Sequence, residues 1–425
     1  MPQILGSTAT SLAAIEETLV DAQAEVLWAL PDVAAKTPLQ SAKVKDRGLA
    51  TWGDLFAWLC HRGVALRVLI PDHDPLLSPN AHRRAWLAGS ALAQRAHGDC
   101  QIVVAPQEHT LPALWQRRVA KHAKAAFETL TTGDPGRLTP VQRKLTTAKG
   151  PRSFITSHQS FVVVDRVQAI VTTGPIRKDA NLVTLRVQDG DLSSALKGHF
   201  ADCWQAAIKA GVSLANRPRA LQTGTRGVSR PDLRLIRSLT KPRHGLLPEL
   251  VQSTLPSALC QAIVAAQRYV YLESAALTLP QVLTSLTSAP QVILVLPQNL
   301  ETTLLDGEGK AILAAQSQAV ADLASALGER FAVHITPHPT ANLAIIDDDT
   351  TVLGSSAFSQ KATRCDTETS VLIKGQEAAT LMDARGKLWL GSDADPRQAA
   401  HWPGVTPGEV PKLPLIDRLL PKALL

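Results

Sequence analysis

One eight-residue pattern occurs twice in this chain and constrains its fold more than any other feature. The first copy runs from His158 to Asp165, and the second runs from Thr340 to Asp347. Each copy reads as a polar residue, a spacer, a second polar residue, four mainly apolar residues and an aspartate. A pattern that recurs in both halves of a chain indicates two similar structural units.

The length and composition support this organisation. A chain of 425 residues with 45% hydrophobic content is too long for one ordinary core, so two domains are expected. The five cysteines are scattered and lack CxxC spacing, which favours reduced thiols over a disulfide framework or a zinc site. We see no signal peptide and no segment that could span a bilayer, and therefore expect a cytoplasmic location.

Positive charge is concentrated in two segments. Nine Lys or Arg lie between Arg117 and Arg152, and eight lie between Arg217 and Arg243, with few acidic residues among them. Such segments suggest an anionic partner, either phospholipid headgroups or nucleic acid. Solvated loops and a linker account for the same composition equally well. Peripheral contact with a membrane through these basic segments is thus one hypothesis.

Strand-like and helix-like patterns alternate along both halves, which predicts an α/β protein with two layered domains. We expect a first domain over residues 1–211, a basic linker over 212–230, a second domain over 231–395 and a proline-rich tail over 396–425. Residues 131–152 lack periodicity and are expected to form a long loop.

With its surroundings, the doubled pattern resembles the His-x-Lys-x4-Asp signature of the phospholipase D superfamily, in particular its bacterial, eukaryotic-like two-domain branch. The likeness extends to residues 69–75, 82–86 and 199–204 in the first half, and to residues 234–238, 269–273, 354–357 and 366–368 in the second. It implies two domains, each a mixed β-sheet flanked by helices, related by pseudo-twofold symmetry, with both motifs facing one cleft. It implies no cofactor and no metal.

The resemblance also implies a chemistry and assigns residues to it. In such a family one histidine attacks phosphorus, the histidine of the other half protonates the leaving alcohol, and a later carboxylate orients each histidine. Lysines and an asparagine hold the phosphate oxygens. Catalytic positions then fall on His158, Asp165, Asp347 and Glu368. Phosphate-contacting positions fall on Ser160, Asn342, Gly354 and Ser355.

Several positions depart from the family pattern. Ser160 and Asn342 stand where lysines are expected, and Thr340 replaces the second histidine. Each lost donor to a developing oxyanion costs about 2.7–4 kcal/mol. We therefore expect a catalytically impaired protein that binds anionic phospholipid or another phosphodiester, as a monomer. The alternatives are a divergent active phospholipase D with His158 as nucleophile, and a nucleic-acid-binding module, which the 4% aromatic content disfavours for single strands.

Two further groups of polar residues have alternative interpretations. His338 lies two residues before Thr340. If the strand register shifted by two residues, the His338 side chain would lie on the same side of the strand as that of Thr340 and could contact substrate as the missing acid. A loop histidine between Pro337 and Pro339 is the other interpretation. The sequence Asp72-His73-Asp74 has spacing that could bind a cation, although such residues are also typical of turns.

Overall fold

A computed structural model describes residues 2–402 except 77, 105–106, 110–112, 148–152, 211, 224–227, 242–248, 300–305 and 393. Most strands belong to two eight-stranded mixed sheets, one from each half of the chain. In spatial order, the first sheet contains β1 (Gln3–Leu5), β9 (Thr184–Gln188), β8 (Gln168–Thr172), β7 (Phe161–Val164), β2 (Glu25–Ala29), β3 (Ala65–Ile70), β4 (Cys100–Val104) and β10 (Val212–Ala215). The second contains β12 (Val251–Ser253), β11 (Leu233–Thr240), β18 (Thr369–Lys374), β17 (Thr350–Gly354), β16 (Leu343–Ile346), β13 (Val270–Glu273), β14 (Val292–Pro297) and β15 (Phe331–Thr336).

The two sheets repeat one topology. From β1 to β4 and from β11 to β15, seven strands follow one another in the same order, with four antiparallel pairings and then two parallel pairings. The predicted α/β architecture with two mixed sheets flanked by helices is thereby confirmed. The small strands β5 (Gln107–His109) and β6 (Ser153–Ile155) form a separate antiparallel pair.

Helices cover both sheets. The first half carries α1 (Thr8–Val20), α2 (Ala42–Lys45), α3 (Trp52–His61), α4 (Pro79–Ala93), α5 (Ala113–Thr132), α6 (Pro140–Thr146) and α7 (Gly190–Ala210). The second carries α8 (Leu255–Val264), α9 (Pro280–Leu286), α10 (Asp306–Leu327), α11 (Gln360–Arg364) and α12 (Glu377–Leu390). Among the described residues, no helix is both long and apolar enough to cross a membrane.

The apolar run of each motif forms a central strand whose two faces belong to different cores. In β7, Phe161 and Val163 lie in a core shared by the two halves, whereas Val162 and Val164 lie in the core of the first half. In β16, Leu343 and Ile345 lie in the shared core, and the alternate residues lie in the core of the second half. Successive side chains of a strand point to opposite faces, which accounts for this division.

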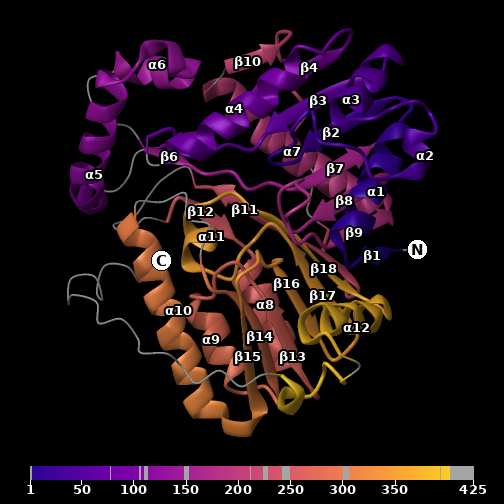
Figure 1. The fold of residues 1–425 in the computed structure, drawn as a ribbon, viewed down its shortest axis with the longest axis vertical. Coiled ribbons are helices and arrows are strands. Elements are labelled where there is room, and N and C mark those ends of the chain that lie inside the picture. The colour runs from indigo at the N-terminus through magenta and orange to yellow at the C-terminus, as the bar shows by residue number, and fades with distance from the viewer. Residues whose placement is uncertain are drawn as a thin grey trace.

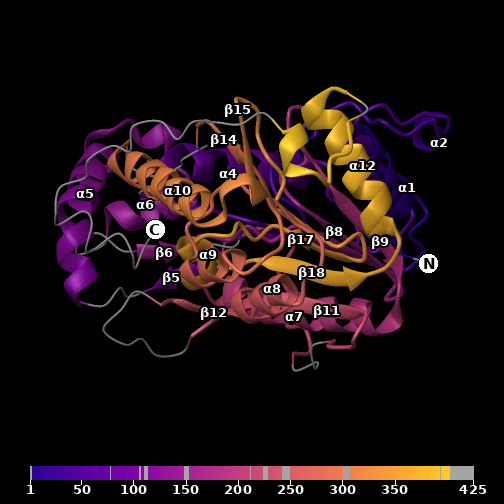
Figure 2. The same cartoon turned by 90° about the horizontal axis from the view of Figure 1, so that it is seen from below.

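The shared core joins the halves into one body. It contains residues of both sheets together with the inner faces of α7 and α12, and the two halves lie one above the other (Figure 1). α12 of the second half contacts β1 of the first half, near the N-terminus (Figure 2).

Three segments differ from expectation or fall partly outside the described residues. The predicted loop over 131–152 contains α6, which has a capping box of Thr139 and Gln142 and a proline at its first turn. The expected linker 212–230 begins with β10, which pairs with β4. Of the proline-rich tail, residues 403–425 lie outside the described residues.

Candidate functional site

Backbone contacts between the halves position the first histidine of the doubled motif. The N–H of His158 donates to the carbonyl of Thr367 at 3.0 Å, and the N–H of Thr367 donates to the carbonyl of Thr156 at 3.0 Å. These bonds form a short parallel bridge between the segment before β7 and the segment before β18. The histidine of the first half is therefore held against carboxylates of the second.

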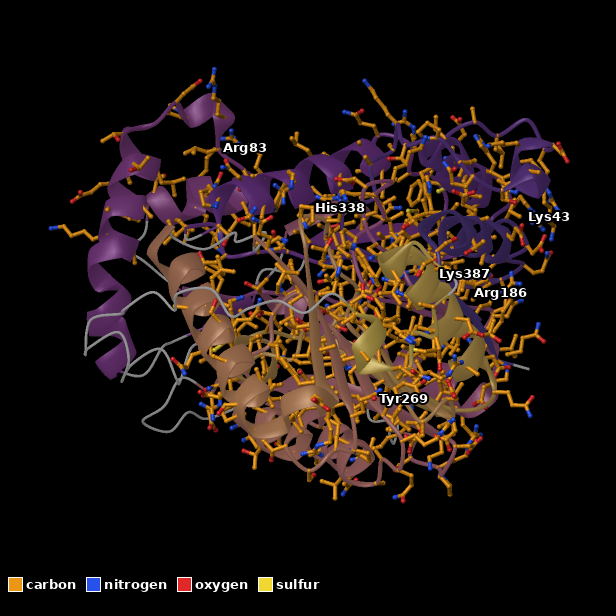
Figure 3. All side chains as sticks on the ribbon, turned by 60° about the horizontal axis from the view of Figure 1, so that its bottom comes forward. Lys43, Arg83, Arg186, Tyr269, His338 and Lys387 are labelled. Atoms are coloured by element: carbon orange, nitrogen blue, oxygen red, sulfur yellow. The ribbon has the colours of Figure 1, made fainter. Side chains whose placement is uncertain are left out.

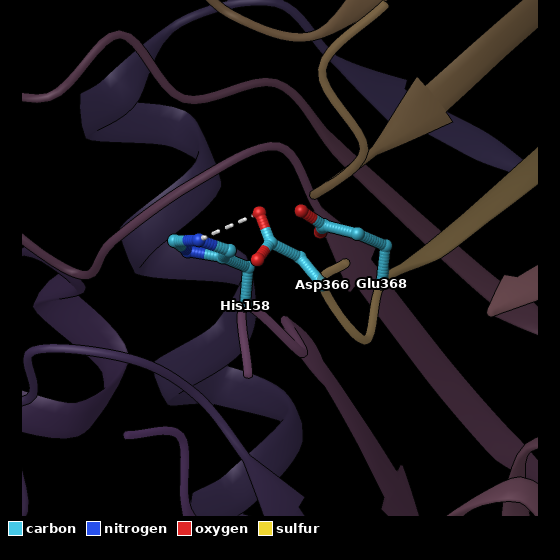
Figure 4. Close-up of side chains that lie close together, drawn as sticks. All are labelled: His158, Asp366 and Glu368. Atoms are coloured by element: carbon cyan, nitrogen blue, oxygen red, sulfur yellow. Dashed lines mark ion pairs between the residues drawn. The ribbon is translucent and has the colours of Figure 1, made fainter. Parts of the chain in front are cut away.

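His158, Asp366 and Glu368 form a three-residue cluster (Figure 4). One donor atom from each lies within 4.8 Å of the others, and His158 Nε2 is 3.7 Å from Asp366 Oδ2. Asp366 and Glu368 are 4% and 2% exposed, whereas the His158 side chain is 35% exposed. The imidazole is thus the part of the cluster that a ligand from solvent can reach.

Lys361 on α11 adds a cation to this cluster. Its Nζ donates to Asp366 Oδ2 at 2.8 Å. Burial acts to lower the pKa of Lys361, but the charge and hydrogen bond of Asp366 outweigh it and raise that pKa. The ammonium is therefore retained at neutral pH.

The second carboxylate of the cluster has a different environment. Burial, followed by repulsion from Asp366, raises the pKa of Glu368 well above its usual value. The hydroxyl of Ser355 donates to Glu368 Oε2. Ser355 and Glu368, both predicted site residues, are thus brought together beside His158.

The environment of His158 favours a neutral imidazole. Loss of solvation, and then the nearby Lys361 ammonium, lower the pKa of His158 to about 3. The ring of His73 packs edge-on against that of His158 at a centroid distance of 5.3 Å. A neutral imidazole has a free lone pair at neutral pH, which both a nucleophile and a metal ligand require.

The predicted phosphate-contacting residues other than Ser355 have local structural roles. Ser160 is fully buried and donates to the carbonyl of Gly174 at 3.1 Å. A Cβ atom at Gly354 would lie 2.3 Å from backbone atoms of Thr369 and Ser370. Glycine is therefore required at the end of β17, where its backbone lies against that of the paired strand β18.

Asn342 supports the site through the backbone. Its Nδ2 donates to the carbonyl of Ser355 at 2.8 Å, and its Oδ1 accepts from the N–H of Ala275 at 3.0 Å. Asn342 is 8% exposed, so it fixes the backbone at Ser355 and offers little surface to a phosphate.

The structure places Asp165 and Asp347 away from the cluster. Both follow the final strand residue and adopt left-handed φ values of 50° and 54°. The carboxylate of Asp165 accepts from the backbone N–H groups of Gln23, Ala24 and Glu25, and that of Asp347 accepts from those of Gln267, Arg268 and Tyr269. Extended chain rises about 3.3 Å per residue, so a separation of seven residues from the His position puts both aspartates at the far ends of their strands. Their interactions support the fold.

The corresponding position in the second half is occupied by a buried ion pair. Thr340 stands where the second histidine is expected, and its Oγ1 is buried without a hydrogen-bond partner among the described residues. The next residue, Ala341, donates its N–H to Glu273 Oε1 at 2.8 Å. Glu273 also pairs with Arg385, and both side chains are fully buried. Asn181 of the first half bonds to both ions at 3.2 and 2.9 Å.

His338 does not join the cluster. It is exposed in the turn after β15, and its N–H donates to Thr336 Oγ1 at 3.1 Å (Figure 3). The group of neighbouring imidazole and carboxylate donors found among the described residues contains His158 but not His338. The structure thus agrees with the loop interpretation of this residue.

The polar sequence Asp72-His73-Asp74 is divided among several contacts. Asp72 accepts from the buried His82 ring at 2.9 Å, and the N–H of Leu76 donates to Asp74 at 2.8 Å. Only His73 faces the site. The Asp74 contact is typical of a turn, whereas Asp72 pairs with a residue of α4, and the two carboxylates do not gather around one cation.

Sequence reasoning assigned no site role to Lys361, and it considered His73 only as part of a possible cation site with Asp72 and Asp74. Asp366 lies two residues before Glu368, so a carboxylate pair was visible there. No sequence pattern pointed to Lys361, because its closeness to the cluster depends on how the chain connects α11 to β18.

Comparisons with known proteins agree with this architecture. No protein-family model matches the sequence, and no curated protein matches it either. The structure is similar to the crystal structure of phosphatidylserine synthase from Haemophilus influenzae Rd KW20, with a TM-score of 0.50 and 13% identity over 99% of this chain and 92% of that chain. Nuc from Salmonella typhimurium, a phospholipase D family member, matches 37% of this chain and 90% of its own at 17% identity and a TM-score of 0.27. The chain therefore shares the fold of that phosphatidylserine synthase structure, with two mixed β-sheets flanked by helices.

Proposed function

We propose that the protein binds the phosphodiester of an anionic phospholipid at the His158 cluster and that its turnover of this ligand is severely impaired. The similar solved structure is a phosphatidylserine synthase, whose name refers to a phospholipid headgroup. This likeness in fold motivates the choice of ligand class.

The observation that carries the proposal is the asymmetry of the two motif positions. The first half contributes His158, whereas the second has Thr340 beside the buried pair of Glu273 and Arg385. A general acid typically contributes about 10²–10⁴ in rate, and each preorganised donor to the developing charge contributes about 2.7–4 kcal/mol. A site that lacks the second imidazole and both motif lysines loses most of an ordinary acceleration.

The remaining groups suit binding of a phosphate. Lys361 offers a positive charge and His158 a partly exposed ring. Because the charge of Lys361 is already paired with that of Asp366, we expect the affinity for a phosphate to depend on several contacts together. The exposed side chains of Arg143 and Lys144 on α6 could add attraction to an anionic membrane surface. Helices α5 and α6 lie together at one end of the molecule (Figures 1 and 2).

An active phosphodiesterase is the second candidate, and a specific observation favours it. The lowered pKa of His158, about 3, leaves a neutral imidazole at physiological pH. A ring nitrogen of His158 would form a bond to phosphorus beside Lys361 while the phosphorus–oxygen bond to the headgroup alcohol breaks, and the departing alkoxide would take its proton from water. The two candidates differ in whether bound phospholipid is converted.

Binding to vesicles that contain phosphatidylglycerol, compared with pure phosphatidylcholine vesicles, tests the proposal. We expect His158→Ala and Lys361→Met to weaken binding about tenfold, which corresponds to about 1.4 kcal/mol. The matched controls are His338→Ala and the exposed Lys374→Met, which should bind as wild type. Thermal melting of each variant verifies folding.

Several outcomes would contradict the proposal. Equal binding to both vesicle types, or no effect of either site variant, would exclude the cluster as a phospholipid site. Tighter, salt-dependent binding to duplex DNA would favour a nucleic-acid partner instead.

A further inference from the structure

We propose that His158, Asp366 and Glu368 form a binding site for one divalent transition-metal ion, with Zn²⁺ as the ion that the donor set fits best. The three side chains reach one space from two chain segments, His158 from before β7 and the two acids from before β18 (Figure 4). Their donor atoms lie within 4.8 Å of one another.

The donor types fit this ion class. An imidazole nitrogen with two carboxylate oxygens resembles the three-ligand sets by which catalytic zinc is held, with a further position open to water or substrate. Zn²⁺ binds such donors at about 2.0–2.2 Å, so the 3.7 Å separation of His158 Nε2 and Asp366 Oδ2 is close to what a shared ion needs. The partly exposed His158 ring gives the ion a route from solvent.

The charge balance is a second, independent observation. Burying a carboxylate is costly unless a counter-charge lies close by. Lys361 pairs with Asp366, but Glu368 has no ion pair within the described part of the chain and accepts only from the Ser355 hydroxyl. A bound dication would supply the counter-charge that an ionised Glu368 lacks.

Two neighbouring groups define the surroundings of the ion. Lys361 donates to Asp366 Oδ2, the same oxygen that lies 3.7 Å from His158 Nε2, so the ammonium and the ion would share this oxygen. His73 Nδ1 is buried without a hydrogen-bond partner among the described residues, and its ring packs on His158. This nitrogen is available to a water or phosphate oxygen bound at the open position.

A metal here would replace what the motifs have lost. Ser160 and Asn342 bond to local backbone carbonyls where lysines would hold phosphate oxygens, and an ion at the cluster would hold such an oxygen as a Lewis acid. Repulsion between Lys361 and the ion would fall once an anionic phosphate binds. Metal and phosphodiester should then each strengthen binding of the other by the same factor. This coupling, unlike the metal site itself, rests on the proposed function.

Calorimetric titration of Zn²⁺ into the chelator-treated full chain tests the site. We expect one equivalent to bind, and we expect His158→Ala and Glu368→Gln each to weaken binding at least tenfold. His338→Ala and Cys260→Ser are matched controls that remove other accessible donors and should bind as wild type. Circular dichroism melting verifies that the variants fold, and Glu368→Gln keeps the shape of the side chain.

The outcomes separate this inference from the proposed function. Absence of saturable Zn²⁺ binding, or equal binding by His158→Ala and Glu368→Gln, overturns the metal site even if metal-free protein binds phosphatidylglycerol vesicles. Zn²⁺ binding that requires both residues supports the site even if neither form of the protein binds vesicles, a result that would defeat the proposed function alone. Vesicle binding that strengthens about tenfold with Zn²⁺ supports both.

Discussion

Replacing Glu273 by glutamine should destabilise the protein strongly, because it leaves Arg385 as an unpaired buried cation. Both side chains are fully buried, and the guanidinium donates to both carboxylate oxygens at 2.5–3.0 Å. Removing one charge of such a buried ion pair typically lowers the free energy of unfolding by about 3–5 kcal/mol. Since the total stability of a domain is about 5–15 kcal/mol, this is a large fraction.

The size of the effect follows from how many contacts converge on Glu273. Its carboxylate also accepts from the Tyr271 hydroxyl at 2.9 Å and from the N–H of Ala341 at 2.8 Å. A glutamine could satisfy some of these donors, but its amide group would face the guanidinium. We therefore expect the full cost and a disturbed backbone at Thr340.

Urea denaturation followed by tryptophan fluorescence measures the loss. With an m value of about 3 kcal/mol/M, a cost of about 3–5 kcal/mol should shift the first transition to lower urea by about 1–1.7 M. Asp99→Asn is the matched control, because Asp99 pairs with Arg67 but its side chain is 42% exposed, and it should cost no more than about 1 kcal/mol.

A double variant tests whether the unpaired charge causes the loss of stability. Glu273→Leu combined with Arg385→Met removes both charges and should recover much of the stability lost by Glu273→Gln. A cost below 1 kcal/mol for the single change, or a double variant as unstable as the sum of its parts, would show that this ion pair does not hold the second motif position.

Three further predictions concern pH, backbone packing and charge. His199 is fully buried with a pKa lowered to about 3 by burial and then by Arg237, so the unfolded state takes up a proton below its pKa of 6.5 while the folded state does not. The contribution of a neutral His199 to the free energy of unfolding is therefore fully present above pH 6.5 and is lost as the pH falls, by about 2 kcal/mol at pH 5. His199→Gln should remove this part of the pH dependence of urea unfolding. Gly354→Ala should cost about 1–3 kcal/mol in the same assay because its Cβ would overlap the backbone of β18, whereas Gly190→Ala, with open space around it, should not. Replacing Arg143 and Lys144 by alanine should weaken vesicle binding by about 2 kcal/mol at low salt and by much less at 1 M salt. If the double replacement does not change binding at low salt, α6 is not part of the membrane contact.

Local sequence patterns were sufficient to predict much of the fold. The alternating apolar residues of 161–164 and 343–346 predicted central strands, and the structure assigns their alternate faces to different cores. The helix α6 was missed, although Thr139, Pro140 and Gln142 are typical of a helix start. Its seven residues are too few to produce a clear period.

The site was harder to predict because it depends on contacts between distant segments. His158 and Glu368 were assigned from the resemblance, but their proximity results from the bridge of Ser157 to Thr367 across the halves. Lys361 belongs to a five-residue helix whose direction is set by tertiary packing. Asp165 and Asp347 matched a catalytic pattern, whereas their left-handed backbone and backbone partners became visible only in the structure.

The central claim is that the His158 cluster binds a phospholipid phosphodiester without converting it at the rate of an enzyme. The most direct test measures binding and product release in one sample, using phosphatidylglycerol vesicles with wild-type protein and with His158→Ala. We predict saturable binding that the substitution weakens about tenfold, and product no faster than in buffer. Release of headgroup or phosphatidic acid that depends on His158 and exceeds the buffer rate by several orders of magnitude would contradict the account.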